Sequence, residues 1–218
     1  MWKAQSMSRD LELLYFSDPM CSWCWGFSPV MKRLKSRFES VIPCATVMGG
    51  LHTGESPPLN AEYRDILLHH WREVEAKTGQ PFDYESAAPL GSIYNTEPPS
   101  RALVLMRSLV PEYEFDYLWA LQKAFYQDAR DLSEVKVLLE LATDRGVEEK
   151  VFMQRFDSPT LKMATNMDFQ LAREIQARAF PSIVLRAGHD YTFVSVGYQE
   201  YEILEPLISG WIDKQSAA

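Results

Sequence analysis

Apolar residues form short runs near both ends of the chain. Leu11–Phe16 is a run of apolar and aromatic residues of strand length, and Val41–Met48 is a second. Near the other end, Ser182–Arg186 and Tyr191–Val196 flank Ala187-Gly188-His189-Asp190, a sequence typical of a hairpin turn. The pattern therefore predicts two strands at each end of the chain.

Between these runs, apolar residues recur at helical spacing. A helix is expected to start at about Ser22, with Pro29 inside it as a kink. A final helix is expected around Leu204–Trp211, its start delayed by Pro206. Ser100 is interpreted as the N-cap of one middle helix. The middle helices are expected near residues 59–78, 100–110, 114–126, 133–143, 147–156 and 160–177.

This order of elements indicates how the chain is divided. Strand, helix and strand come first, a long helical block follows, and strand, strand and helix come last. The fold class expected is α/β, with residues 1–57 and 178–218 forming one domain and residues 58–177 an all-helical insertion.

Composition narrows the class of partner. The chain has 218 residues with 22 Lys and Arg against 30 Asp and Glu, a net charge of −8, which argues against nucleic acid or an anionic membrane as partner. No run approaches the roughly 18 apolar residues of a membrane span. The N-terminus lacks the apolar core of a signal peptide, so a cytoplasmic location is expected.

Cys21-Ser22-Trp23-Cys24 is the segment with the clearest chemistry. Two cysteines three apart at a strand-to-helix turn can close a small disulfide. The helix N-terminus favours a thiolate, so the pKa of Cys21 is expected to be low. Cys21 is then the nucleophile and the more shielded Cys24 the resolving thiol. A zinc site is the alternative, with Cys44 and His52 as further ligands; otherwise Cys44 is interpreted as an inert core thiol.

The segment Phe16–Gly26 (FSDPMCSWCWG) strongly resembles the active site of the DsbA family of thioredoxin-like proteins. It is most similar to the cytoplasmic FrnE-like branch, whose members are predicted protein disulfide isomerases. That resemblance implies a thioredoxin-like fold with a helical insertion. It also implies a cis-proline before the third strand, where Phe180-Pro181 stands here.

The resemblance also implies a function. The chain would exchange protein or peptide disulfides through Cys21 and Cys24, with Trp23, Phe180 and Pro181 at the substrate. No metal or organic cofactor is required, and glutathione or a thioredoxin-type protein would recycle the dithiol. Ser22-Trp23 departs from the Pro-His of the strongly oxidising relatives, so strong oxidising power is not carried over. Reduction or isomerisation suits the cytoplasm better.

A second enzyme class shares the inserted thioredoxin fold. Glutathione-dependent enzymes such as 2-hydroxychromene-2-carboxylate isomerase and kappa-class glutathione transferase have serine at the nucleophile position and lack the second cysteine. The presence of both Cys21 and Cys24 counts against this alternative.

Overall fold

A four-stranded sheet lies at the centre of the computed structural model, which describes residues 11–55, 57–86 and 88–217. Its strand order is β2-β1-β3-β4, with β1 and β2 parallel and the other neighbours antiparallel. The strands are β1 (Leu11–Ser17), β2 (Cys44–Met48), β3 (Ser182–Ala187) and β4 (Asp190–Val196). All four were predicted, and β2 is shorter than its apolar run.

The helices follow the predicted order. Helix α1 connects the first two strands, α2 to α7 lie between β2 and β3 in the chain, and α8 follows β4. Their bounds are α1 (Ser22–Phe38), α2 (Ala61–Thr78), α3 (Glu97–Leu109), α4 (Glu114–Tyr126), α5 (Val135–Thr143), α6 (Glu149–Phe156), α7 (Pro159–Glu174) and α8 (Tyr201–Ser216), with a short 3₁₀ turn η1 (Pro111–Tyr113) before α4. The α/β thioredoxin-like fold is confirmed, whereas the division into domains at residues 57 and 178 stays a prediction.

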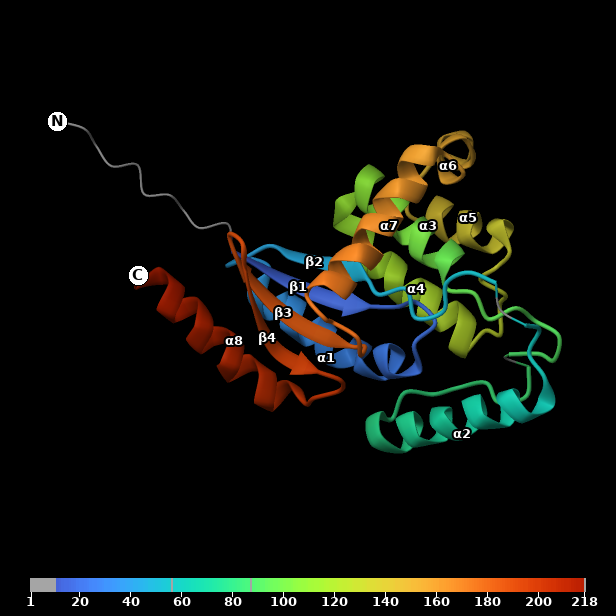
Figure 1. The fold of residues 1–218 in the computed structure, drawn as a ribbon, viewed down its shortest axis with the longest axis horizontal. Coiled ribbons are helices and arrows are strands. Elements are labelled where there is room, and N and C mark those ends of the chain that lie inside the picture. Colours follow the sequence, from blue (N-terminus) through green and yellow to red (C-terminus); the bar gives the residue numbers. More distant parts are fainter. Residues whose placement is uncertain (1–10, 56, 87, 218) are drawn as a thin grey trace.

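The two faces of the sheet pack against different helices. Leu13, Tyr15, Ile183 and Leu185 belong to a large core with residues of α1 and α8. Leu14, Phe16 and Val184 point the other way and pack with Ala172 of α7. Figure 1 shows α8 beside the edge strand β4, at the end of the sheet opposite to α3–α6. Within the described residues, no helix is long and apolar enough to cross a membrane.

Two helices that contain proline start earlier than the sequence predicted. Helix α3 begins at Glu97 with Thr96 as N-cap, so Ser100 lies inside the helix and the prediction for it was wrong. Helix α8 begins at Tyr201 and contains Pro206, so the predicted delay was also wrong. In α3, Pro98 and Pro99 lie in the first turn, where the N–H groups have no intrahelical partner, so these prolines cost no hydrogen bond. Pro206 lies beyond the first turn of α8 and does cost one helical hydrogen bond.

Side chains from the helices satisfy the outer edge of β2. Glu114 of α4 accepts hydrogen bonds from the backbone N–H and the hydroxyl of Thr46. Asp168 of α7 accepts from the Met48 N–H at 2.9 Å, and Arg107 of α3 donates to the Thr46 carbonyl at 2.7 Å. Arg107 and Asp168 also form an ion pair at 2.8 Å. These contacts hold the end of β2 in place. The loop that follows β2 leads to the turn that carries the cysteines.

Candidate active site

Cys21 stands at the N-cap of α1, where the sequence placed it. Its backbone is extended, with φ −88° and ψ 115°, and its carbonyl accepts the Trp25 N–H at 3.0 Å. Cys24 lies within the first helical turn. Both are free thiols, and Cys21 is 7% exposed while Cys24 is 0% exposed. The expected order of access is therefore present, although both residues are more buried than the sequence suggested.

The peptide bond between Phe180 and Pro181 is cis, as predicted. The Cys21 Sγ lies 3.6 Å from the Phe180 carbonyl oxygen, so the proline loop faces the cysteine turn across 159 positions of sequence. The Phe180 ring covers Gly49, where an added Cβ would approach the ring within 2.0–2.4 Å. Gly49 is thus needed for the close approach of that ring.

The thiol of Cys21 does not have the low pKa that its helix position suggested. A hydrogen bond with Cys24, then burial and the charges of Cys24 and Asp18, raise the pKa of Cys21 well above its usual value. The Cys24 backbone amide lowers this pKa, in the direction expected at a helix start, but the opposing effects are larger. The expectation of a thiolate-stabilising site was therefore wrong, because helix position alone does not describe the buried surroundings.

Sequence reasoning missed Asp18, which is fully buried beside the cysteines. Its carboxylate accepts the Met20 N–H and the Leu51 N–H, both at 2.9 Å. Burial raises the pKa of Asp18 to about 6, although hydrogen bonds from these amides and from Thr96 oppose the shift. Asp18 therefore joins the cysteine turn to the loop after β2. Its position in the Ser-Asp-Pro-Met turn before the cysteines was the available signal.

Two tyrosine hydroxyls also hold the backbone around the cysteine pair. The Tyr94 hydroxyl donates to the carbonyl of Met20, the residue before Cys21. The Tyr15 hydroxyl lies 3.5 Å from the Cys24 carbonyl, to which it donates. Tyr94 comes from the long loop between α2 and α3, so only the folded chain brings it here.

The other residues singled out by the sequence have different surroundings. Trp23 is half-buried, and its ring lies 6.0 Å from that of Tyr198. Burial raises the pKa of the half-buried Cys44 thiol to about 11, which fits an inert thiol. His52 lies with its ring 5.1 Å from that of Tyr94. Among the described residues, no three His, Cys, Asp or Glu side chains gather as metal ligands, so the zinc alternative finds no site there.

The chain is similar to known thioredoxin-like proteins in sequence and in structure. The thioredoxin family model matches residues 112–206. A candidate protein disulfide isomerase from Nitrosomonas europaea has 36% sequence identity and a TM-score of 0.89, over 94% of this chain and 98% of that one. The cytosolic disulfide reductase DsbM from Pseudomonas aeruginosa has 23% identity and a TM-score of 0.75, over 92% of this chain and 98% of that one.

Curated relatives are longer proteins. The ClpXP adapter protein SpxH of Halalkalibacterium halodurans is 25% identical over 83% of this chain, which spans 60% of that relative's length. The Nitrosomonas europaea protein, by contrast, is matched over nearly its whole length at 36% identity. Together with the thioredoxin-like sheet and the Cys21–Cys24 pair, this shows that the chain belongs to the DsbA family of thioredoxin-like thiol–disulfide oxidoreductases.

Proposed function

We propose that this chain exchanges disulfides with protein or peptide substrates, with Cys21 as the nucleophile and Cys24 as the resolving thiol. The observation that carries the proposal is the 3.6 Å approach of the Cys21 sulfur to the carbonyl oxygen before the cis-proline. An extended substrate that pairs with this proline loop would place its disulfide at Cys21. Trp23, Phe180 and Pro181 are proposed to contact that substrate.

The proposed chemistry transfers two electrons from the enzyme to the substrate. The Cys21 thiol loses its proton to solvent, and the thiolate attacks one sulfur of the substrate disulfide. The substrate S–S bond breaks, and its other sulfur leaves as a thiolate that takes up a proton. The Cys24 thiol then loses its proton and attacks the Cys21 sulfur, which forms the Cys21–Cys24 disulfide and releases the first substrate sulfur as a thiolate that takes up a proton. Two molecules of a thiol such as glutathione would restore the dithiol and leave as one disulfide.

The electrostatics of the pair favour net reduction or isomerisation over oxidation. A stabilised thiolate makes the disulfide form a strong oxidant, because it stabilises the reduced enzyme. Here the hydrogen bond with Cys24, followed by burial, raises the pKa of Cys21, so the Cys21 thiolate is weakly stabilised. A weak oxidant suits the reducing cytoplasm, which is the location we propose. The structure of the similar protein DsbM, a cytosolic disulfide reductase, has also been solved with glutathione, which supports glutathione as the recycling thiol.

Trapping of mixed disulfides tests the roles of the two cysteines. Cys24→Ser should accumulate adducts on Cys21, because only a thiol held close resolves them quickly. Cys21→Ser should accumulate few, since Cys24 is fully buried. Cys44→Ser is the control and should behave as the parent protein. The measurement is a non-reducing gel of tagged protein from acid-quenched cells. More adducts with Cys21→Ser than with Cys24→Ser would reverse the assignment.

One other function has a specific observation in its favour. The curated relatives are ClpXP adapter proteins, which favours binding of a protein partner as a second candidate function of the chain. A double Cys21→Ser, Cys24→Ser variant separates the two functions: an adapter would still bind its partner, and an oxidoreductase would lose its activity. A glutathione-dependent isomerase is less well supported, because both cysteine positions are occupied by cysteine.

A further inference from the structure

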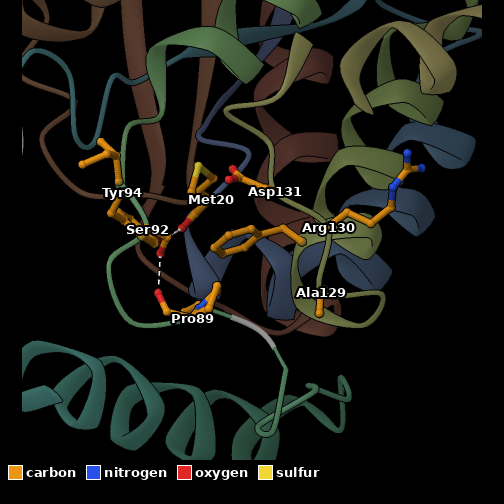
Figure 2. A pocket seen from close by; sticks show the side chains of 10 residues that line it. Met20, Pro89, Ser92, Tyr94, Ala129, Arg130 and Asp131 are labelled. Carbon is orange, nitrogen blue, oxygen red and sulfur yellow. Dashed lines mark hydrogen bonds between the residues drawn. The ribbon is translucent and has the colours of Figure 1, made fainter. Parts of the chain in front are cut away.

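A small pocket opens beside the turn that carries Cys21. Its walls come from three separate segments: Met20 of the turn, Ile93 and Tyr94 of the loop before α3, and Phe125 and Ala129 at the end of α4. Figure 2 shows these side chains around one hollow, with Tyr94 and Met20 on the same side of it. The pocket is thus built partly by the residue adjacent to the nucleophile and partly by the helical segment.

Two alanines that line this pocket have an unfavourable backbone conformation. Ala88 has φ 51° and Ala129 has φ 50°, and Gln176 is the third non-glycine residue with positive φ in the described part of the chain. The Arg64 Nε donates to the Ala88 carbonyl at 3.0 Å and so helps to hold that loop. Strained residues gather at functional sites because the surrounding structure must maintain them. Two of the three described non-glycine residues with positive φ therefore line this pocket, which indicates that the fold maintains the shape of the pocket despite the backbone strain.

The chemistry of the walls is apolar. Arg130 at the rim forms an ion pair with Glu140, and in Figure 2 its guanidinium points away from the hollow. Asp131 accepts the Ser133 N–H at 2.8 Å. The charged groups of Arg130 and Asp131 therefore both have partners within the chain. The surface that the pocket presents to a ligand is mainly hydrocarbon. A small apolar group suits it better than a charged one.

The volume and position identify that group further. The cavity measures about 40 Å³, and one water-sized group needs about 10–15 Å³, so it holds about three carbon atoms, the size of a valine side chain. A disulfide places two Cα atoms about 5.5–6 Å apart, and adjacent residues are about 3.8 Å apart. Met20, which lines the pocket, is adjacent to Cys21 in the chain, so the pocket lies at a distance from Cys21 that a residue next to the attacked cysteine of a substrate can span.

We propose that this pocket receives the small aliphatic side chain next to the cysteine that Cys21 attacks, and so selects polypeptide disulfides by sequence. The inference rests on the proposed function, since it requires Cys21 to be the nucleophile. It assigns a specificity role to Ile93, Tyr94 and Phe125, none of which contributes a reacting atom.

Short cysteine peptides joined to thionitrobenzoate test this selection, since release of the coloured thiol reports attack on the peptide. The peptides carry Gly, Val, Asp or Trp beside the cysteine. The intact protein should show kcat/KM at least about ten-fold higher for Val than for Gly, because the pocket buries the three carbon atoms of the Val side chain. Asp and Trp should give no gain over Gly.

Two variants of one loop provide the matched comparison. Ile93 is 40% exposed and lines the pocket, so Ile93→Ala should widen it and move the preference from Val toward Trp. Leu90 is 61% exposed on the same loop and does not line it, so Leu90→Ala should keep the parent preference. The control substrate is the symmetrical disulfide of two thionitrobenzoate molecules. It has no peptide side chain, so it measures thiol exchange alone.

The outcomes separate the two proposals. Reaction with the symmetrical disulfide but equal rates for all four peptides overturns the pocket assignment and leaves the proposed function standing. An unchanged preference in Ile93→Ala, or the same change in Leu90→Ala, also overturns it. No reaction with any disulfide removes the proposed function, and the pocket assignment with it.

Discussion

Replacing Asp18 with asparagine should change how the stability of the protein depends on pH. Asp18 is fully buried, and burial raises the pKa of its carboxyl from 3.8 to about 6. A carboxyl with a raised pKa binds its proton more tightly in the folded state than in the unfolded state. The parent protein therefore loses stability as the pH rises from about 4 to 6, and the loss is complete above that range.

The magnitude follows from the size of the shift. A change from 3.8 to about 6 corresponds to about 3 kcal/mol for ionising Asp18 in the folded protein. About 2 kcal/mol of this develops between pH 4 and pH 7. Asparagine cannot ionise, so the variant should gain about 2 kcal/mol relative to the parent over this interval. Hydrogen bonds lost by the amide lower the stability of the variant by the same amount at each pH and cancel in the comparison.

Urea unfolding of parent and variant at pH 4, 5, 6 and 7 measures this difference. Asp83→Asn is the control: backbone N–H groups of Ser86 and Glu85 lower the pKa of this exposed carboxyl, so its effect should have the opposite sign. If the free energies of unfolding of the parent and of Asp18→Asn changed with pH by the same amount, burial would not raise the pKa of Asp18 as argued. Asp18→Asn should also speed alkylation of Cys21 at pH 7, because the Asp18 charge raises the pKa of Cys21.

Three further substitutions test other parts of the site. Gly49→Ala should lower disulfide reductase activity at least ten-fold, measured with insulin, because its Cβ would approach the Phe180 ring within 2.0–2.4 Å; an active variant would show that the ring moves freely. Changing Ser22-Trp23 to Pro-His should raise the reduction potential by tens of millivolts in glutathione redox buffers, and an unchanged potential would mean that the dipeptide does not tune the pair. Asp168→Ala should cost about 2 kcal/mol in urea unfolding by leaving Arg107 half-buried without its carboxylate; a loss under about 0.5 kcal/mol would contradict this.

Features that depend on neighbouring residues in sequence were predictable. The apolar runs fixed the four strands, and the step from Leu11–Ser17 into Ser22–Phe38 placed Cys21 at a helix start. The cis Phe180-Pro181 bond was expected from the resemblance to the DsbA family, which places a cis-proline before the third strand, and the structure agrees.

Features that depend on the assembled fold were not predictable. The pKa of Cys21 is raised by its hydrogen bond with Cys24 and by burial, with a smaller contribution from the charge of Asp18, whereas the helix start alone suggested a lowered pKa. Tyr94 reaches Met20 from a loop more than 70 positions away, where the sequence has no periodic signal. Helix propensity also misplaced the start of α8, because Pro206 is tolerated on an exposed surface where the lost hydrogen bond is met by solvent.

The side-chain contacts along β2 affect attempts to make a smaller redox domain. If α2–α7 were excised and β2 joined directly to β3, the Thr46 and Met48 N–H groups and the Thr46 carbonyl would lose Glu114, Asp168 and Arg107. Their backbone groups would then form an open strand edge, which is a template for pairing with other chains. A truncated protein should therefore aggregate even if its cysteine turn were intact. A minimal version of this enzyme would need charged or proline residues placed along β2 to replace what the helices supply.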